Sequence, residues 1–219
     1  MKLLPPSPAL LPALVLVALL PMTLLAQINT EFLIKKIEPS MVESPQITAS
    51  GYRKQTQGRP SQWLEVDVTF EREEVSGAPK FSDEVTVDFF ILLNNAAHTA
   101  DRKPTLLTGS TTLADIPFAK GLHSAAFVSP QALARFFDGK VPTTINQVVT
   151  DVGVTLSGST GLAAIGSSKG TVDAKKGEGW WGAESDASKV AGRVLEKSQT
   201  PFAHLAWDYY QPSKSKAGN

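Results

Sequence analysis

The chain contains no cysteine. Disulfide bonds and thiolate metal sites are therefore excluded, and so is a lipid anchor on an N-terminal cysteine. If the protein is exported, its stability must come from burial of apolar side chains and from backbone pairing. A chain of this size is long enough to bury one core by those means.

The chain also has no excess of charge of either sign. It has 21 basic and 21 acidic residues, which gives a formal net charge of zero. Nucleic acids and anionic membrane surfaces attract proteins that carry a basic excess. We therefore predict no nucleic-acid partner.

Recognisable metal and catalytic clusters are missing as well. The three histidines, His98, His123 and His204, are far apart in the sequence and form neither an HxH nor an HExxH motif. The acidic runs at 71–74 and 83–84 lack the Asp/Asn–Gly pattern of a calcium loop. We predict no metal, no cofactor and no catalytic residue.

A leader opens the chain. Lys2 is the only charged residue before Glu31, the run from Ala9 to Leu20 is almost entirely apolar, and Ala26 offers a small residue for cleavage. This order is typical of a secretory signal peptide. The alternative is an uncleaved membrane anchor, but a spanning helix needs about 20 apolar residues and this run is shorter and contains proline. We predict a signal peptide over residues 1–26 and no transmembrane segment after its removal.

Period-two patterns dominate the rest of the chain. Trp63 to Phe70 alternates apolar and polar residues, and Val85 to Leu93 has one continuous apolar face. Such alternation predicts strands that cover a core on one side. Further strands are predicted at 31–37, 46–52, 106–113, 122–128, 148–156, 162–165, 194–195 and 203–210.

Helix signals are few. Ser129 to Phe137 has a capping serine, proline at the first helical position and Gly139 beyond the end. Asp186 to Arg193 is a second, weaker helix prediction.

Many short strands with little helix favour an antiparallel β-sandwich over residues 27–212, followed by a disordered tail at 213–219.

The apolar faces of these runs define an expected core. Its members share inward positions on alternating segments. They are Leu64, Val66, Val68, Phe70, Val87, Phe89, Ile91, Val152, Val154 and Trp207.

One string resembles a catalytic motif. Gly166 to Gly170 reads Gly-Ser-Ser-Lys-Gly, which matches the nucleophile elbow of serine hydrolases with Ser168 as the nucleophile. Such an elbow requires a helix directly after the serine, and the residues that follow are unsuited to one. We expect a flexible loop, with a hydrolase as the least favoured hypothesis.

A tryptophan pair stands in a glycine-rich loop. Trp180 and Trp181 lie between Gly179 and Gly182. If exposed, the pair would anchor a protein partner or stack on a sugar ring. The preferred alternative is that the loop folds back and buries the rings as a cap on the sandwich.

The C-terminal string from Leu195 to Tyr210 reads LEKSQTPFAHLAWDYY. It resembles the end of a family of exported verrucomicrobial proteins that are associated with type IV pilus assembly. The resemblance implies an immunoglobulin-like fold over Glu31 to Tyr210 and a non-enzymatic role, and it supplies no catalytic or ligand residues. The leader differs from that of a pilin, because its apolar stretch precedes the cleavage site instead of forming a stalk.

These observations lead to one main hypothesis. The protein is expected to be an exported envelope or type IV pilus-associated protein, located in the periplasm, on the outer membrane or outside the cell. It would bind protein partners through sheet edges or loops. The alternative is an exported carbohydrate-binding module that uses Trp180 and Trp181 to hold a glycan.

The leader generates the first testable prediction. N-terminal sequencing of the protein recovered from envelope or medium should begin near Gln27, because a signal peptidase cleaves after a small residue such as Ala26. A cytoplasmic protein that retains Met1 would contradict this prediction.

Overall fold

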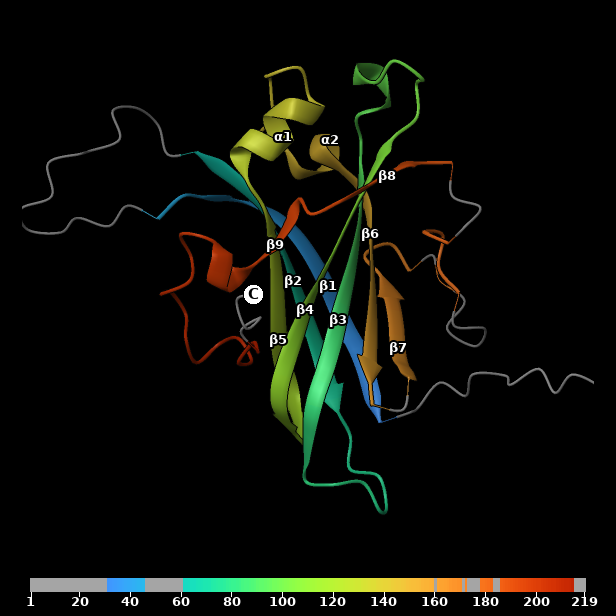
Figure 1. The fold of residues 1–219 in the computed structure, drawn as a ribbon, viewed down its shortest axis with the longest axis vertical. Helices are drawn as coiled ribbons and strands as arrows, with labels where there is room; N and C mark the ends of the chain where they lie inside the picture. The colour runs from blue at the N-terminus through green and yellow to red at the C-terminus, as the bar shows by residue number, and fades with distance from the viewer. Residues whose placement is uncertain are drawn as a thin grey trace, which may run out of the picture.

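The computed structural model describes residues 31–45, 61–159, 161–170, 172, 178–182 and 186–214. These residues form two β-sheets packed face to face (Figure 1). Sheet A has the strand order β1 (Phe32–Glu43), β2 (Gln62–Arg72), β5 (Ala119–Val128), β9 (Val194–Glu196). Sheet B has the order β7 (Gly161–Ser167), β6 (Val149–Gly158), β3 (Phe81–Leu93), β4 (Thr105–Pro117), β8 (Ser188–Ala191).

The path of the chain confirms the predicted sandwich. After β1 and β2 the chain crosses to sheet B for β3 and β4, returns to place β5 beside β2, and crosses again to place β6 beside β3. Strand β7 then adds to the free edge of β6. These neighbour relations are those of strands A, B and E and of strands C′, C, F and G in immunoglobulin-type sandwiches.

One pair of strands departs from the antiparallel pattern. Strand β8 runs parallel to β4, and it lies in the segment 186–193 that was predicted to be helical. That helix prediction is wrong. Gly192 has a φ of 73°, a conformation that glycine adopts freely and that ends a strand or helix. The edge of β4 supplies the backbone partners of this segment, in register from Ser188 to Ala191.

Short helices gather at one end of the sandwich. They are η1 (Ala96–His98), α1 (Pro130–Phe136) and α2 (Ile145–Val148), all at the top of Figure 1. Helix α1 confirms the prediction for this segment, because the Ser129 hydroxyl accepts a hydrogen bond from the Ala132 amide at 3.2 Å and Gly139 has a φ of 79°. A further 3₁₀ turn, η2 (Lys197–Gln199), follows β9.

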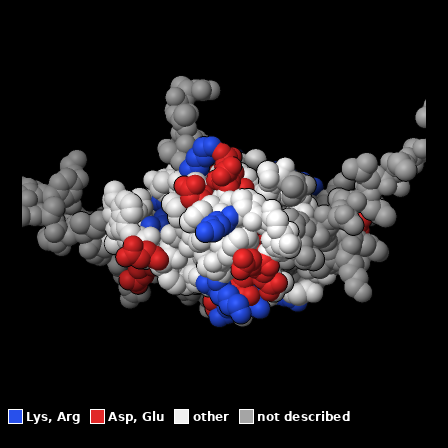
Figure 2. All heavy atoms as spheres, turned by 90° about the horizontal axis from the view of Figure 1, so that it is seen from below, with Lys and Arg blue, Asp and Glu red and all other residues white. Residues whose placement is uncertain are grey.

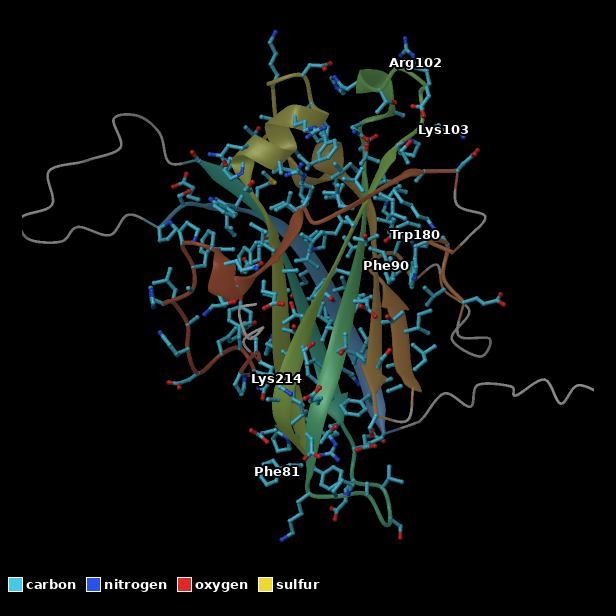
Figure 3. All side chains as sticks on the ribbon, viewed as in Figure 1. Phe81, Phe90, Arg102, Lys103, Trp180 and Lys214 are labelled. Carbon is cyan, nitrogen blue, oxygen red and sulfur yellow. The ribbon has the colours of Figure 1, made fainter. Side chains whose placement is uncertain are left out.

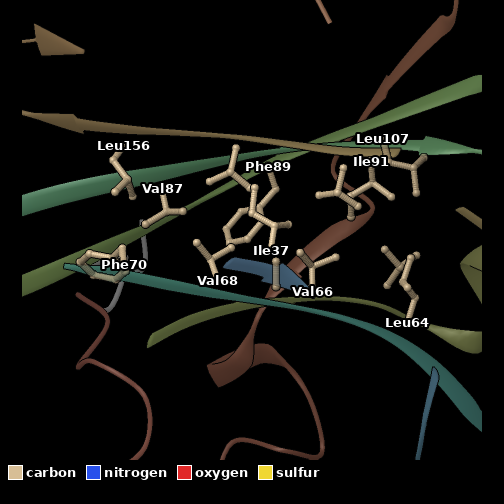
Figure 4. Close-up of a cluster of buried hydrophobic side chains, with 14 of the residues drawn as sticks. Ile37, Leu64, Val66, Val68, Phe70, Val87, Phe89, Ile91, Leu107 and Leu156 are labelled. Atoms are coloured by element: carbon tan, nitrogen blue, oxygen red, sulfur yellow. The ribbon is translucent and has the colours of Figure 1, made fainter. Parts of the chain in front are cut away.

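The core lies between the two sheets (Figure 4). Leu64, Val66, Val68 and Phe70 on β2 face Val87, Phe89 and Ile91 on β3 and Val152 and Val154 on β6, and all of them are fully buried. The period-two prediction for these strands is confirmed. Trp207 is the exception, since it is 69% exposed and belongs to no strand.

A buried arginine closes the lower end of the sandwich. The Arg72 side chain forms an ion pair with Glu31 at 2.6 Å and donates to the backbone carbonyls of Ile116, Pro79 and Lys80. Its guanidinium also lies 4.2 Å from the centre of the Phe118 ring. Because its donors are shared among an ion pair and three carbonyls, this charge is satisfied away from water.

The structure also corrects the C-terminal predictions. Residues 203–210 form consecutive turns instead of a strand. Ser213 and Lys214 do not belong to a free tail: Ser213 forms a β-bridge with Leu113, and the Lys214 amide donates to the Thr112 carbonyl at 2.8 Å. The predicted leader, the predicted strand at 46–52 and residues 215–219 lie outside the described residues.

The packing of β3 generates a stability prediction. Phe89→Ala should lower the free energy of unfolding by about 3–5 kcal/mol, because the ring is fully buried between the sheets. Phe81→Ala is the matched control on the same strand: this ring is 53% exposed, and its loss should cost about 0.5 kcal/mol or less. Urea denaturation measures both, and equal losses would show that the register is wrong.

Candidate functional site

The outer face of sheet A is covered by residues 197–214, which we call the C-terminal segment. This segment follows β9 and lies along β5 (Figure 1). It carries the LEKSQTPFAHLAWDYY string except for the first two residues, which belong to β9. Its contacts define the candidate site.

Aromatic stacking anchors the segment. The Phe202 ring stacks on Phe127 with centroids 4.9 Å apart and meets the edge of Trp63 at 5.7 Å. Trp63, Ala125 and Phe127 are buried on the side of sheet A that faces away from the sandwich core. Three apolar residues on an outer face require a cover, and Phe202 supplies it.

Two tyrosines bind two carboxylates on β2. The Tyr210 hydroxyl donates to Glu65 at 2.9 Å, and the Tyr209 hydroxyl donates to Asp67 at 2.9 Å. His123 on β5 lies 3.1 Å from Asp67 through Nδ1 and stacks under Tyr209 with ring centroids 4.0 Å apart. The Tyr209 ring therefore covers His123, whose side chain is 15% exposed.

Burial shifts the acid–base behaviour of this cluster. Desolvation raises the pKa of Glu65, while the hydrogen bond from Tyr210 lowers it in part. Desolvation and the hydrogen bond to Asp67 raise the pKa of Tyr209 to about 12. Desolvation lowers the pKa of Lys197, and Glu65 opposes that shift. The tyrosines therefore stay neutral and act as hydrogen-bond donors near neutral pH.

The end of the segment ties the two sheets together. The Gln211 amide donates to His123 on β5 at 2.9 Å, and Pro212 accepts from Ala114 on β4 at 3.0 Å. The Lys214 ammonium forms an ion pair with Glu84 on β3, and Lys214 lies towards the lower end of the molecule (Figure 3). One short stretch thus contacts both layers of the sandwich.

The middle of the segment exposes large apolar side chains. Leu205, Trp207 and Tyr209 are 41%, 69% and 46% exposed. Ala206 between them has a φ of 48°, a left-handed conformation that costs about 1–2 kcal/mol for a residue with a Cβ. The Trp207 indole donates to the His204 carbonyl at 3.0 Å, which fixes the ring on the outside of the turn. The fold holds these side chains out in a defined geometry.

A cavity of about 430 Å³ lies beneath the segment. The segment contributes Lys197, His204, Trp207 and Tyr210 to its walls, and strands β4 and β5 contribute Thr111, Leu113, Ser124 and Ala125. This is the size of a pocket that binds small molecules.

The tryptophan pair of the other loop packs on sheet B. Trp181 is 7% exposed and stacks on Phe90 with centroids 4.9 Å apart, while Trp180 meets its edge at 5.3 Å and is half-buried. A Cβ at Gly153 would overlap the Trp181 ring, so the ring lies against bare backbone of β6. Phe90 and Trp180 lie at neighbouring heights on this face (Figure 3). Trp181 is therefore buried, as the preferred alternative expected. The ring covers the outer face of sheet B, however, and not one end of the sandwich.

Ser168, the serine of the elbow-like string, is hydrogen-bonded to β6. The Ser168 hydroxyl donates to Asp151 at 2.6 Å and accepts from the Val152 amide at 3.1 Å. A hydrolase with Ser168 as nucleophile would need an acid and then a histidine later in the chain, and Glu178 or Asp186 followed by His204 have that order. Glu178 belongs to the tryptophan loop, His204 to the C-terminal segment, and Asp186 pairs with Lys103. His98 pairs with Asp138 at the end that carries the helices.

The remaining surface offers few other sites. Within the described ranges, no three His, Cys, Asp or Glu side chains come together as metal ligands. In the same part of the chain, no helix has the length and hydropathy needed to cross a membrane. Lysine, arginine and carboxylate side chains lie next to one another on the lower face (Figure 2).

The raised pKa of Glu65 generates a pH prediction. A carboxyl whose pKa is raised by folding adds stability below its unfolded pKa, near 4.5, and that stability is lost as pH rises through the folded pKa. Glu65→Gln retains an acceptor for Tyr210 and removes the charge. The variant should therefore gain stability relative to the parent protein between about pH 4 and about pH 7. Urea denaturation at both pH values measures this gain, with exposed Glu73→Gln as the control; an equal change in both variants would contradict the prediction.

Comparison with known proteins places the fold. The structure is similar to a crystal structure of a protein from Akkermansia muciniphila, with a TM-score of 0.67 and 21% sequence identity over 85% of this chain and 94% of that chain. At this identity the likeness shows a shared β-sandwich fold. A search among curated proteins finds no match. A protein-family model matches residues 24–217, which is nearly the whole chain, and the chain therefore belongs to the family that this model describes.

Proposed function

We propose that this protein is an exported, non-enzymatic component of the bacterial cell envelope that binds a protein partner through its C-terminal segment. The observation that carries the proposal is the exposure of Leu205, Trp207 and Tyr209 within five residues of one another. Tryptophan and tyrosine in such a position are the residue types that dominate binding energy at protein interfaces.

The construction of the segment supports a binding role. The backbone is fixed before it meets a partner, because Phe202 is stacked on sheet A and Gln211 and Pro212 are bonded to β5 and β4. A preorganised surface loses less conformational entropy on binding than a flexible loop. The left-handed Ala206 is a strained residue at an exposed turn, and such strain gathers at functional positions.

The choice of partner follows from the sequence. The predicted leader directs the chain out of the cytoplasm, and the family match begins at residue 24, close to the predicted cleavage site after Ala26. The C-terminal string resembles a family associated with type IV pilus assembly. We therefore propose envelope proteins, and components of a type IV pilus system first among them, as partners.

The C-terminal segment is a stronger candidate surface than the tryptophan loop. Trp181 is buried against Phe90, so it is unavailable without rearrangement of the loop. Trp180 alone is half-buried. For the same reason the two rings do not form an exposed flat platform, which argues against the carbohydrate-binding alternative that uses both.

Partner capture tests this proposal. The mature protein should capture an envelope protein, and Leu205→Ser combined with Trp207→Ser should weaken that capture by at least about tenfold, since hot-spot losses exceed about 2 kcal/mol. The thermal midpoint should hardly change, because both side chains are exposed. Trp180→Ala is the matched control and should bind normally. Capture that survives the double substitution, or that is lost in Trp180→Ala, would overturn the choice of surface.

A further inference from the structure

The cavity beneath the C-terminal segment reaches the interior of the sandwich. Its floor includes Thr111 and Leu113 on β4 and Ser124 on β5, all of which occupy buried, core-facing positions. Ser124 pairs in register with Val68, a core residue of β2. The cavity therefore opens along the side of the sandwich where β4 and β5 face each other, below the point where β9 ends.

The floor of the cavity is polar where the core pattern calls for apolar residues. On β5 the inward positions run Leu122, Ser124, Ala126, Val128. Ser124 is 1% exposed, and its hydroxyl has no hydrogen-bond partner among the described residues. A buried hydroxyl without a partner is rare and calls for an explanation. A ligand hydroxyl in the cavity would supply the missing partner.

The walls of the cavity are rich in uncharged hydrogen-bonding groups. Ser198, Gln211 and Ser213 add hydroxyl and amide groups, while Trp207 and Tyr210 add aromatic rings. No carboxylate lines the cavity. Lys197 and His204 also line it, and the Lys197 ammonium already donates to the Ala203 carbonyl at 3.3 Å and lies 5.3 Å from the centre of the Tyr210 ring. A cationic ligand would therefore meet no carboxylate, and the lysine is already engaged by groups of the segment itself.

We infer that this cavity binds a single neutral pyranose sugar unit. A pyranose ring presents hydroxyl groups along its edge and an apolar face of C–H groups. The serine, threonine and glutamine side chains match the edge, and the Trp207 and Tyr210 rings match the face. The volume of about 430 Å³ falls in the range of small-ligand pockets.

This sugar site overlaps the protein-binding surface at Trp207 alone. Leu205 and Tyr209 belong to the exposed surface and do not line the cavity, whereas Ser124 and Thr111 line the cavity and are hidden from any protein partner. Only Trp207 belongs to both. The sugar site is thus independent of the proposed function, and variants at these positions distinguish the failure of one from the failure of the other.

Sugar titration tests the inference. The probes are glucose, galactose and N-acetylglucosamine, each as the free sugar and as its methyl glycoside, which mimics the end of a glycan chain. At least one should bind saturably with a Kd of about 1 mM or tighter in calorimetry and saturation-transfer NMR. If only the glycosides bind, the natural source is a glycan end; if only free sugars bind, it is a free monosaccharide.

Four variants give the test its controls. Ser124→Ala should weaken binding about tenfold while the thermal midpoint stays equal or rises, because the parent hydroxyl has no partner in the free protein. Thr111→Val should act in the same direction, and Trp207→Ala should abolish binding. Ser110→Ala, at the neighbouring position on β4 and outside the cavity lining, should bind as the parent does. The inference is overturned if no probe binds saturably, or if binding persists unchanged in Ser124→Ala and Trp207→Ala.

Discussion

Burial of one apolar layer between two sheets holds this protein together, because a chain without cysteine has no covalent tie between the layers. Both margins of the layer are closed by noncovalent contacts. Arg72 closes the lower end by joining Glu31 on the N-terminal side to the carbonyl of Ile116 at the end of β4. The C-terminal segment closes the side between β5 and β4 through Gln211 and Pro212. The sandwich therefore depends on both ends of its described chain being docked.

The docking of the C-terminal segment determines where function is found. Stacking of Phe202 on Phe127 and the tyrosine–carboxylate bonds hold the segment flat on sheet A. Since its inner side chains are used for this attachment, the side chains of the turn at Ala206 project outwards. The same attachment leaves a cavity where the inward residues of β4 and β5 are small or polar. The exposed surface and the cavity are thus two results of one packing arrangement.

The sequence predicted the parts of the fold that depend on local periodicity. The strands around Phe70 and Phe89 follow a strict alternation that only a half-covered strand produces, and Ser129 begins its helix as predicted. The prediction of Trp207 as a core residue was wrong because alternating apolar residues in consecutive turns have the same sequence pattern as a strand. The roles of Arg72 and Ser124 could not be predicted from the sequence. The partners of Arg72 lie far from it in the chain, and the cavity beside Ser124 forms between strands that are distant in the chain. The exposed surface at Leu205, Trp207 and Tyr209 could not be predicted for the same reason, although the aromatic residues between Phe202 and Tyr210 indicated a special segment.

The central claim is that the C-terminal segment is a docked binding surface. Hydrogen–deuterium exchange of the mature protein, alone and with its captured envelope partner, tests it most directly. Slow exchange is expected at the Gln211 and Lys214 amides in the free protein, because both are bonded to strands of the sandwich. Added protection is expected over residues 203–209 on binding, and none at 178–182. Fast exchange throughout 203–214 in the free protein, or protection on binding confined to 178–182, would contradict it.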